Sequence, residues 1–239
     1  MKKKILWLVT ARSGSKSIPH KNIKLLGGHP LLSYRIKTAI NTTYNHDLWI
    51  STDSEEYASI AQKYGAERPF IRPEKLSLDD SSSSDVVLHA MEYAKKTNKG
   101  YDYIGMLEPT SPFITSKQLD TAISLLDNNS KAIAIVAVKE SRPHKIFIQE
   151  ESEFLVELSE NFEGLKNLGR QAFKKEITPS GGFYISKWDD FLEMKSFYTP
   201  KTLSYEVDEI SGLEIDEPLD WDFAEFIINK QNRLNETNK

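Results

Sequence analysis

Apolar and polar positions follow one another along this chain in blocks that predict alternating strands and helices. Short runs that are apolar at nearly every position predict buried strands, because a strand covered on both faces has few polar positions; such runs lie at residues 5–9, 48–51, 103–107 and 132–138. Apolar residues spaced three and four apart predict helices at residues 30–40, 53–65, 86–96 and 115–126. This alternation indicates βαβ units, and therefore an α/β fold with a mostly parallel sheet flanked by helices.

Two of these helices begin with the polar pair of a capping box. In this motif the N-cap side chain and the side chain three residues later each accept a hydrogen bond from the other's backbone N–H group. Asp53 with Glu56 and Thr115 with Gln118 have this spacing. The pattern therefore predicts helix starts at Asp53 and Thr115.

The alternation breaks off in the second half of the chain. Between about residues 139 and 178, charged residues, aromatic residues and glycines mix without the period of a helix or a strand. Buried-strand patterns return at residues 182–186, 203–207 and 213–215, and Pro218 is typical of the first turn of a last helix. A chain of 239 residues fits one domain, so we expect residues 1–239 to form a single domain, with about 139–178 as an inserted arm.

The composition removes several classes of protein. Hydrophobic residues make up 39% of the chain and charged residues 28%, which is enough apolar material for a core and excludes general disorder. The net charge of −4 argues against a surface for nucleic acid or anionic membranes. The absence of cysteine excludes disulfides and thiolate metal sites. No run approaches the roughly 18 apolar residues of a membrane helix, and we expect a cytoplasmic protein.

The polar loop after the first predicted strand carries the strongest chemical signal. Residues 10–24 contain no acidic residue and four basic ones: Arg12, Lys16, Lys21 and Lys24. Gly14 permits a close backbone approach, and a basic loop at the carboxyl end of a strand in an α/β sheet suits a polyphosphate. The loop lacks the spacing of a Walker A motif and of GxGxxG. On these residues alone, a solvated basic loop remains the alternative.

Two acidic residues form the second signal. Glu214 and Asp216 lie two positions apart on a predicted strand, so both carboxylates point to the same side and can share one cation. Mg²⁺ prefers one or two carboxylates together with phosphate oxygens and waters. The alternative is that Asp216 caps the helix that begins at Pro218.

A third segment combines a guanidinium group with hydroxyl groups. Arg72 precedes residues 79–85, where four serines lie between aspartates, and these groups suit the edge of a base or a ribose. A loop that ends in a helix N-cap explains the same residues, and without other observations it is the interpretation we favour.

Taken in order, these segments resemble the acylneuraminate cytidylyltransferase family, the CMP–sialic acid synthetases and their relatives. The loop ARSGSKSIPHKN at residues 11–22 is similar to the family's ARxGSKxIPxKN motif, and PTSP follows at residues 109–112. Five further motifs appear in the family's order: Ser51-Thr52-Asp53, Arg72-Pro73, Arg170-Gln171, SGGFYI at residues 180–185, and Ile215-Asp216. The similarity spans residues 4–229.

The resemblance implies a Rossmann-like nucleotidyltransferase that is homodimeric, with the inserted arm as a dimerisation arm that reaches across the partner's site. It implies Mg²⁺ as cofactor and transfer of CMP from CTP to a nonulosonic (sialic-acid-like) sugar, with release of pyrophosphate; neither nucleic acid nor a membrane is an expected partner. The family's nucleotide contacts fall on Arg12, Ser15, Lys16, Lys21, Asn22, Arg72, Ser81 and Ser83. Its sugar contacts fall on Glu108, Thr110, Ser111, Lys145, Arg170, Gln171 and Ser180, and its metal ligands on Glu214 and Asp216. The expected catalytic residues are Arg12, Lys21 and Asp216.

Four positions depart from the family's pattern. Glu214 stands where the metal pair usually begins with aspartate, and Glu108 stands where glutamine usually precedes PTSP. Ile114 replaces a frequent arginine, and Ser180 replaces an asparagine. Three of these changes fall on the acceptor side, so our hypothesis is that CTP is retained and that the acceptor is pseudaminic acid, legionaminic acid or another ulosonate rather than N-acetylneuraminate. The alternatives are a relative that uses another nucleotide or acceptor, a catalytically inactive binding homologue, and a structural module.

Overall fold

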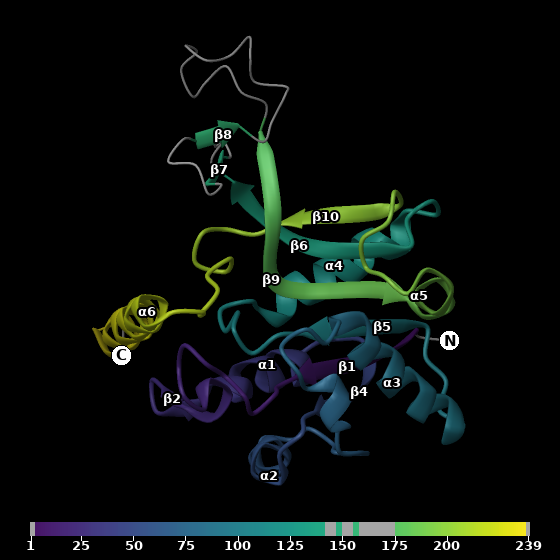
Figure 1. The fold of residues 1–239 in the computed structure, drawn as a ribbon, viewed down its shortest axis with the longest axis horizontal. Coiled ribbons are helices and arrows are strands. Elements are labelled where there is room, and N and C mark those ends of the chain that lie inside the picture. Colours follow the sequence, from purple (N-terminus) through teal and green to yellow (C-terminus); the bar gives the residue numbers. More distant parts are fainter. Residues whose placement is uncertain (1–2, 142–146, 150–154, 158–174, 238–239) are drawn as a thin grey trace.

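A six-stranded sheet forms the centre of the computed structural model, which describes residues 3–141, 147–149, 155–157 and 175–237. In chain order its strands are β1 (Lys4–Thr10), β4 (Asn45–Ser51), β5 (Tyr103–Leu107), β6 (Ala134–Ser141), β9 (Glu176–Lys187) and β10 (Thr202–Glu206). They lie side by side in the order β10-β6-β9-β5-β1-β4 (Figure 1). Only β9 runs antiparallel to its neighbours within this sheet, so the sheet is mostly parallel, as the sequence predicts.

Helices cover both faces of the sheet, so the interior strand β1 is buried on both sides. The β1 side chains Ile5, Trp7 and Val9 pack into one helical layer, while Leu6 and Leu8 pack into the other. The first layer consists of α1 (Leu31–Ile40), α2 (Glu55–Lys63) and α4 (Ser116–Asn128), and the second of α3 (Ser83–Lys96) and α5 (Trp188–Met194). The continuous apolar run at residues 5–9 is thus explained by burial on two faces.

The carboxyl ends of the parallel strands meet at one edge of the sheet. Thr10, the last residue of β1, pairs with Ser51, the last residue of β4, and Val9 pairs with Leu107 at the end of β5. The polar loops that follow these three strands therefore leave from the same edge. Ligands bind at this edge in open α/β sheets.

The predicted arm begins as an extension of two strands. β6 and β9 stay paired from Val138 opposite Pro179 to Ser141 opposite Glu176, and Figure 1 shows β9 continuing past the other strands. A separate antiparallel pair lies between them in the chain, β7 (Phe147–Gln149) with β8 (Leu155–Glu157). The start and the end of the predicted arm thus form strands although they lack apolar alternation, because the exposed β6–β9 ribbon has no buried face. The rest of residues 142–174 lies outside the described residues.

The last helix, α6 (Pro218–Thr237), starts where the sequence predicts. Its Trp221, Ala224 and Ile228 form a buried cluster with Leu26 and Leu31, next to the first loop. The remaining short elements are η1 (Lys21–Ile23), β2 (Leu25–Leu26), β3 (His29–Pro30) and η2 (Glu74–Leu76). None of the helices in the described part of the chain is long and apolar enough to cross a membrane.

One of the two predicted capping boxes is present. Thr115 accepts a hydrogen bond from the backbone N–H of Gln118, whose side chain accepts one from the backbone of Thr115 at 2.8 Å. At α2 the cap is Ser54, which accepts from the backbone N–H of Tyr57 at 3.3 Å. The prediction that Asp53 caps this helix was wrong, because its carboxylate is bound to the first loop instead.

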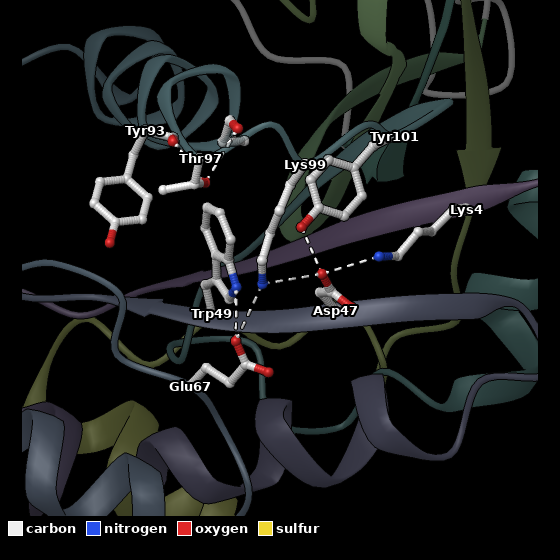
Figure 2. Close-up of polar contacts among 9 residues, drawn as sticks. Lys4, Asp47, Trp49, Glu67, Tyr93, Thr97, Lys99 and Tyr101 are labelled. Atoms are coloured by element: carbon white, nitrogen blue, oxygen red, sulfur yellow. Dashed lines mark hydrogen bonds and ion pairs between the residues drawn. The ribbon is translucent and has the colours of Figure 1, made fainter.

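A network of charges ties the strands together at the amino-terminal edge of the sheet (Figure 2). Asp47 of β4 accepts hydrogen bonds from Tyr101 Oη at 2.6 Å, from Lys4 Nζ at 3.1 Å and from Lys99 Nζ at 3.4 Å. Lys99 also lies over the ring of Trp49. Burial alone would raise the pKa of Asp47, but the hydrogen bonds from Tyr101 and Lys4, with the nearby lysine charges, outweigh it and lower the pKa.

We expect Asp47→Asn to lower the free energy of unfolding by about 1–2 kcal/mol at neutral pH, because Lys4, Lys99 and Tyr101 lose the charged acceptor of their hydrogen bonds. Since the folded pKa of Asp47 is lowered, the wild-type advantage is present above the ordinary value of 3.8 and is lost as the pH falls through the folded value. Urea unfolding at pH 7 and at about pH 3 measures both effects. The matched control is Glu67→Gln, whose side chain is 61% exposed and 3.6 Å from Lys99. Equal losses in both variants would contradict this account.

Candidate active site

A cavity of about 600 Å³ opens at the carboxyl edge of the sheet. All eight residues predicted to contact the nucleotide line it: Arg12, Ser15, Lys16, Lys21, Asn22, Arg72, Ser81 and Ser83. Glu214 and Asp216 line it as well, so the structure brings the predicted metal pair to the predicted phosphate loop. The lining combines four cationic side chains from this set with four carboxylates, Asp79, Glu108, Glu214 and Asp216, and is therefore close to neutral.

Hydrogen bonds from neighbouring elements fix the first loop. Asp53, in the loop after β4, accepts from the backbone N–H and the hydroxyl group of Ser13 at 2.9 and 2.7 Å. Asn22 is buried, and its side-chain amide donates to the carbonyl oxygen of Arg12 at 3.0 Å. The loop is thus held from outside by Asp53 and from within by Asn22, which the alternative of a solvated basic loop does not predict.

Asp79 neutralises two cations of this loop. Its Oδ1 lies 2.7 Å from Arg12 Nη1, and its Oδ2 contacts Lys16 Nζ. The hydrogen bonds from Lys16 and then Arg12 lower the pKa of the Asp79 carboxyl. All three side chains are more than a third exposed, so these ion pairs are weak and an incoming phosphate can replace Asp79.

Arg72 places a buried positive charge in the cavity wall. Its Nε donates to Ser51 Oγ at 3.0 Å and its Nη2 to the carbonyl oxygen of Ser51 at 2.5 Å. Burial lowers the pKa of Arg72 to about 10, and the charge of Asp53 acts against this decrease. The guanidinium therefore stays charged near neutral pH and is anchored to the end of β4.

Each carboxylate of the predicted metal pair holds a lysine. Lys21 Nζ donates to Asp216 Oδ1 at 3.0 Å, which joins the first loop to the acidic segment. Lys139 Nζ donates to Glu214 Oε2 at 3.1 Å. The two carboxylates thus have cationic partners supplied by two different elements of the fold.

The acidic segment, which carries Glu214 and Asp216, has no regular secondary structure where it lines the cavity. The predicted strand at residues 213–215 is not formed, because Ile215 packs into the cluster under α6 and its backbone N–H donates to the carbonyl oxygen of Thr110 at 2.8 Å. Asp220, not Asp216, accepts from the backbone N–H groups before α6, at 3.0 and 2.8 Å. The alternative in which Asp216 is the helix cap is therefore wrong.

The predicted sugar-binding residues fall into three groups. Glu108 and Thr110 line the cavity. Ser111 and Ser180 have no exposed surface, and Ser111 Oγ donates to the carbonyl oxygen of Ser180 at 3.2 Å, so both lie beneath the wall. Outside the described residues lie Lys145, Arg170 and Gln171.

Three charged residues near the site were not assigned to it from the sequence. Lys139 follows a buried strand, as the first loop does, but it was placed in the arm. Asp53 was interpreted as a helix cap. Arg35 is fully buried in α1, donates to the carbonyl oxygen of Gly182 at 2.6 Å, and has its pKa lowered to about 9 by burial. The sequence signal for Arg35 was its position next to the apolar face of the predicted helix at residues 30–40, where a charged residue is unusual.

Glu108 lies in an unfavourable place for a negative charge. Burial raises the pKa of its carboxyl to about 7, and the negative charges of Glu214 and Asp216 add to the increase. The cations Arg35 and Lys21 act against it. Near neutral pH the Glu108 carboxyl is therefore divided between its neutral form, which can donate a hydrogen bond, and its charged form.

A basic loop after the first strand and a carboxylate pair at the same edge of the sheet are features with which Rossmann-like α/β proteins hold phosphorylated ligands at the ends of their strands. The sequence profile of the cytidylyltransferase family matches residues 6–238, and the chain belongs to this family. Membership of this family confirms the prediction of a nucleotidyltransferase enzyme.

Curated relatives agree with this family. The chain is 32% identical to an N-acylneuraminate cytidylyltransferase of Escherichia coli, over 98% of this chain and 54% of that protein, so it spans about half the length of this relative. It is 30% identical to a CMP-N,N'-diacetyllegionaminic acid synthase of Legionella pneumophila, over 94% of this chain and 96% of that one. A pseudaminic acid cytidylyltransferase of Campylobacter jejuni is 32% identical, over 88% and 94%.

Solved structures show the same fold at low sequence identity. A CMP:2-keto-3-deoxy-manno-octonic acid synthetase complexed with CTP has a TM-score of 0.68 at 13% identity, covering 95% of this chain and 99% of that one. A cytidylyltransferase from Leptospira borgpetersenii has a TM-score of 0.57 at 17% identity, covering 98% and 96%. These likenesses confirm the predicted Rossmann-like, mostly parallel sheet.

We expect Glu108→Gln to raise the free energy of unfolding of the metal-free protein by about 2 kcal/mol at pH 8. A pKa raised by one unit corresponds to about 1.36 kcal/mol, and we take less than the resulting total because the Glu108 side chain is partly exposed. Because the pKa of Glu108 is higher in the folded than in the unfolded state, the wild-type protein loses stability as the pH rises from the unfolded-state to the folded-state pKa. The advantage of the Glu108→Gln variant therefore shrinks as the pH falls towards 4.5. Urea unfolding in EDTA at several pH values measures it. Glu209→Gln removes an exposed charge as a control, and an identical pH profile for both variants would contradict the prediction.

Proposed function

We propose that this chain is a Mg²⁺-dependent cytidylyltransferase that transfers CMP from CTP to a nonulosonic acid and releases pyrophosphate. Family membership supports the reaction class, and relatives matched over nearly their full length are named for legionaminic and pseudaminic acids. The observation that carries the proposal is the single cavity in which the basic first loop faces Glu214 and Asp216.

The first loop is the proposed triphosphate site. Arg12, Lys16 and Lys21 present three cations to one cavity, and Ser15 adds a hydroxyl group. In the free protein these cations are paired with carboxylates: Arg12 and Lys16 with the half-exposed Asp79, and the mostly buried Lys21 with the exposed Asp216. A triphosphate can therefore exchange with these partners and be gripped by all three side chains.

Arg72, Ser81 and Ser83 form the proposed wall for the ribose and base. They line the same cavity as the first loop. Ser81 Oγ donates to the carbonyl oxygen of Lys75 at 3.1 Å, and Ser82 caps α3, which fixes this wall from outside. Its fixed donors suit a base edge and ribose hydroxyl groups.

The acidic pair fits a divalent metal ion. Glu214 and Asp216 supply carboxylate oxygens, which Mg²⁺ prefers, and the cavity admits the phosphates that would complete its coordination. Among the described residues no group of three or more histidines, aspartates or glutamates is placed to hold a metal on its own. The fit is thus to a metal that is held jointly by protein and nucleotide. When bound, Mg²⁺ supplies neutralisation of charge on the phosphates.

The chemistry needs alignment more than covalent help from the protein. The anomeric hydroxyl group of the acceptor gives up its proton to water and its oxygen forms a bond to the α-phosphorus, the bond from the α-phosphorus to the bridging oxygen breaks, and pyrophosphate leaves with that electron pair. Arg12 and Lys21 are placed to balance the charge that develops on the phosphate oxygens. We assign the catalytic role to these two residues together with Asp216.

The acceptor side is where this chain differs from the family's pattern. Glu108 and Thr110 line the cavity next to the acidic pair, while Ile114 belongs to the core where an arginine is frequent. We propose an acceptor other than N-acetylneuraminate, pseudaminic or legionaminic acid among them. The sugar contacts at Lys145, Arg170 and Gln171, and a homodimer formed through the arm at about 139–178, are part of the same proposal and rest on the resemblance.

Pyrophosphate release with a panel of acceptors tests the function. We expect turnover with CTP, Mg²⁺ and pseudaminic or legionaminic acid, and a kcat/KM at least about tenfold lower with N-acetylneuraminate, a difference of about 1.4 kcal/mol in transition-state binding. Efficient turnover with N-acetylneuraminate would refute the proposed acceptor. Stabilisation by CTP without pyrophosphate from any acceptor would instead identify an inactive binding homologue.

Two variants test the assigned roles. We expect Arg12→Ala to lower kcat/KM by about 10²-fold, because a preorganised charge near the phosphates is lost. Asp216→Ala is expected to abolish the dependence of the rate on Mg²⁺. Asp79→Asn is the matched control on the same ion pair as Arg12, and it should lower the KM for CTP because a competitor of the phosphates is removed. Unchanged turnover in both Arg12→Ala and Asp216→Ala would place the site elsewhere.

A further inference from the structure

Lys139 reaches from the end of β6 to the acidic segment. Its Nζ donates to Glu214 Oε2 and to the carbonyl oxygen of Gly212, both at 3.1 Å. The Lys139 and Glu214 side chains are only 34% and 29% exposed, so water screens this pair less than the Asp79 pairs across the cavity. Lys139 therefore fixes both the backbone that leads to Glu214 and the carboxylate itself.

Gly181 of β9 closes the other side of the Glu214 carboxylate. Its φ of +59° lies in the left-handed region, and a Cβ at this position would collide with Glu214 Oε1. The glutamate side chain thus uses space that only glycine leaves. One carboxylate oxygen is held by Lys139 and the other lies against Gly181.

The two lysines at the acidic pair differ in their surroundings. Lys21 belongs to the first loop and lines the cavity, so a bound triphosphate offers it new acceptors in place of Asp216. Lys139 is not among the residues that line the cavity, and its hydrogen bonds in the described part of the chain go to Gly212 and Glu214. A nucleotide therefore offers Lys139 no partner in exchange for Glu214.

We propose that Lys139 is a positioning residue that competes with a divalent cation for Glu214, so that the carboxylate pair binds the cation weakly until a nucleotide adds its phosphate oxygens. An ammonium group at hydrogen-bonding distance repels a second cation and occupies an oxygen that the cation needs. The inference rests on the proposed function, because it takes Glu214 and Asp216 as the metal pair. It also gives the glutamate a role, since an aspartate is one methylene group too short to make the same contacts.

Mn²⁺ binding to the nucleotide-free protein, followed by electron paramagnetic resonance, tests this competition. We expect Lys139→Met, which keeps the length of the side chain without its charge, to lower the Kd for Mn²⁺ by about fivefold. The double variant Lys139→Met/Glu214→Gln should lose that gain, and Lys139→Arg should stay near the wild type. An unchanged or higher Kd in Lys139→Met, or a gain that persists in the double variant, overturns the proposal.

Glu214→Asp provides a second route to the same result if Lys139→Met does not fold, which its thermal unfolding shows. Withdrawing the carboxylate from Lys139 is expected to lower the Kd for Mn²⁺ while Lys139 is retained. A Kd equal to that of the wild type contradicts the competition.

Kinetics separate this role from a purely structural one. With Lys139→Met we expect half-maximal rate at a lower Mg²⁺ concentration, a lower kcat because Glu214 is less well oriented, and an unchanged KM for CTP. A structural role would move all three together with the unfolding temperature. If no acceptor yields pyrophosphate, the proposed function fails, while the Mn²⁺ titration still decides the role of Lys139.

Discussion

Opposite charges share one cleft at the edge of the sheet, and each must be neutralised before a ligand arrives. Asp79 pairs with the cations of the first loop, and Lys21 and Lys139 pair with the carboxylates of the acidic segment. Loops far apart in the chain are joined by these contacts, since Lys21 and Asp216 are almost two hundred positions apart. The free cleft is therefore organised and close to neutral, and phosphates can replace Asp79 and Asp216 as partners of the first-loop cations without leaving those cations unpaired.

The sheet supplies the fixed frame on which these exchanges depend. Strands β1, β4 and β5 end at the same edge of the sheet. Polar contacts behind the cleft connect the cavity-lining side chains to these strand ends. Asp53 holds Ser13 of the first loop, and Arg72 is bound to the end of β4. Hydrogen bonds to neighbouring residues thus fix the positions of residues that line the cavity. Such fixed positions are needed to align a phosphoryl group for transfer.

Local pattern was sufficient for the strands and helices of the first half of the chain and for the position of the basic loop. The apolar run at residues 5–9 and the pair Thr115 with Gln118 carry their signal within a few residues, and the structure has the strand and the cap that they predict. The direction of β9, the irregular path of residues 213–215 and the contact of Lys139 with Glu214 depend on tertiary pairing. The periodicity of apolar residues does not determine which strand a given strand pairs with or which residue a charged side chain contacts. These features could therefore be seen only in the structure.

We propose that this nearly neutral, internally paired cleft is a CTP site completed by a metal ion. A thermal-unfolding series with CTP, UTP, ATP and GTP, each with and without Mg²⁺, tests it most directly. At about 100 times its Kd a ligand stabilises the folded state by roughly 2.7 kcal/mol, which such a series resolves. We expect the largest increase in Tm with CTP, and a further increase when Mg²⁺ is added. A larger increase with GTP or ATP, or no increase with any nucleotide, would contradict it.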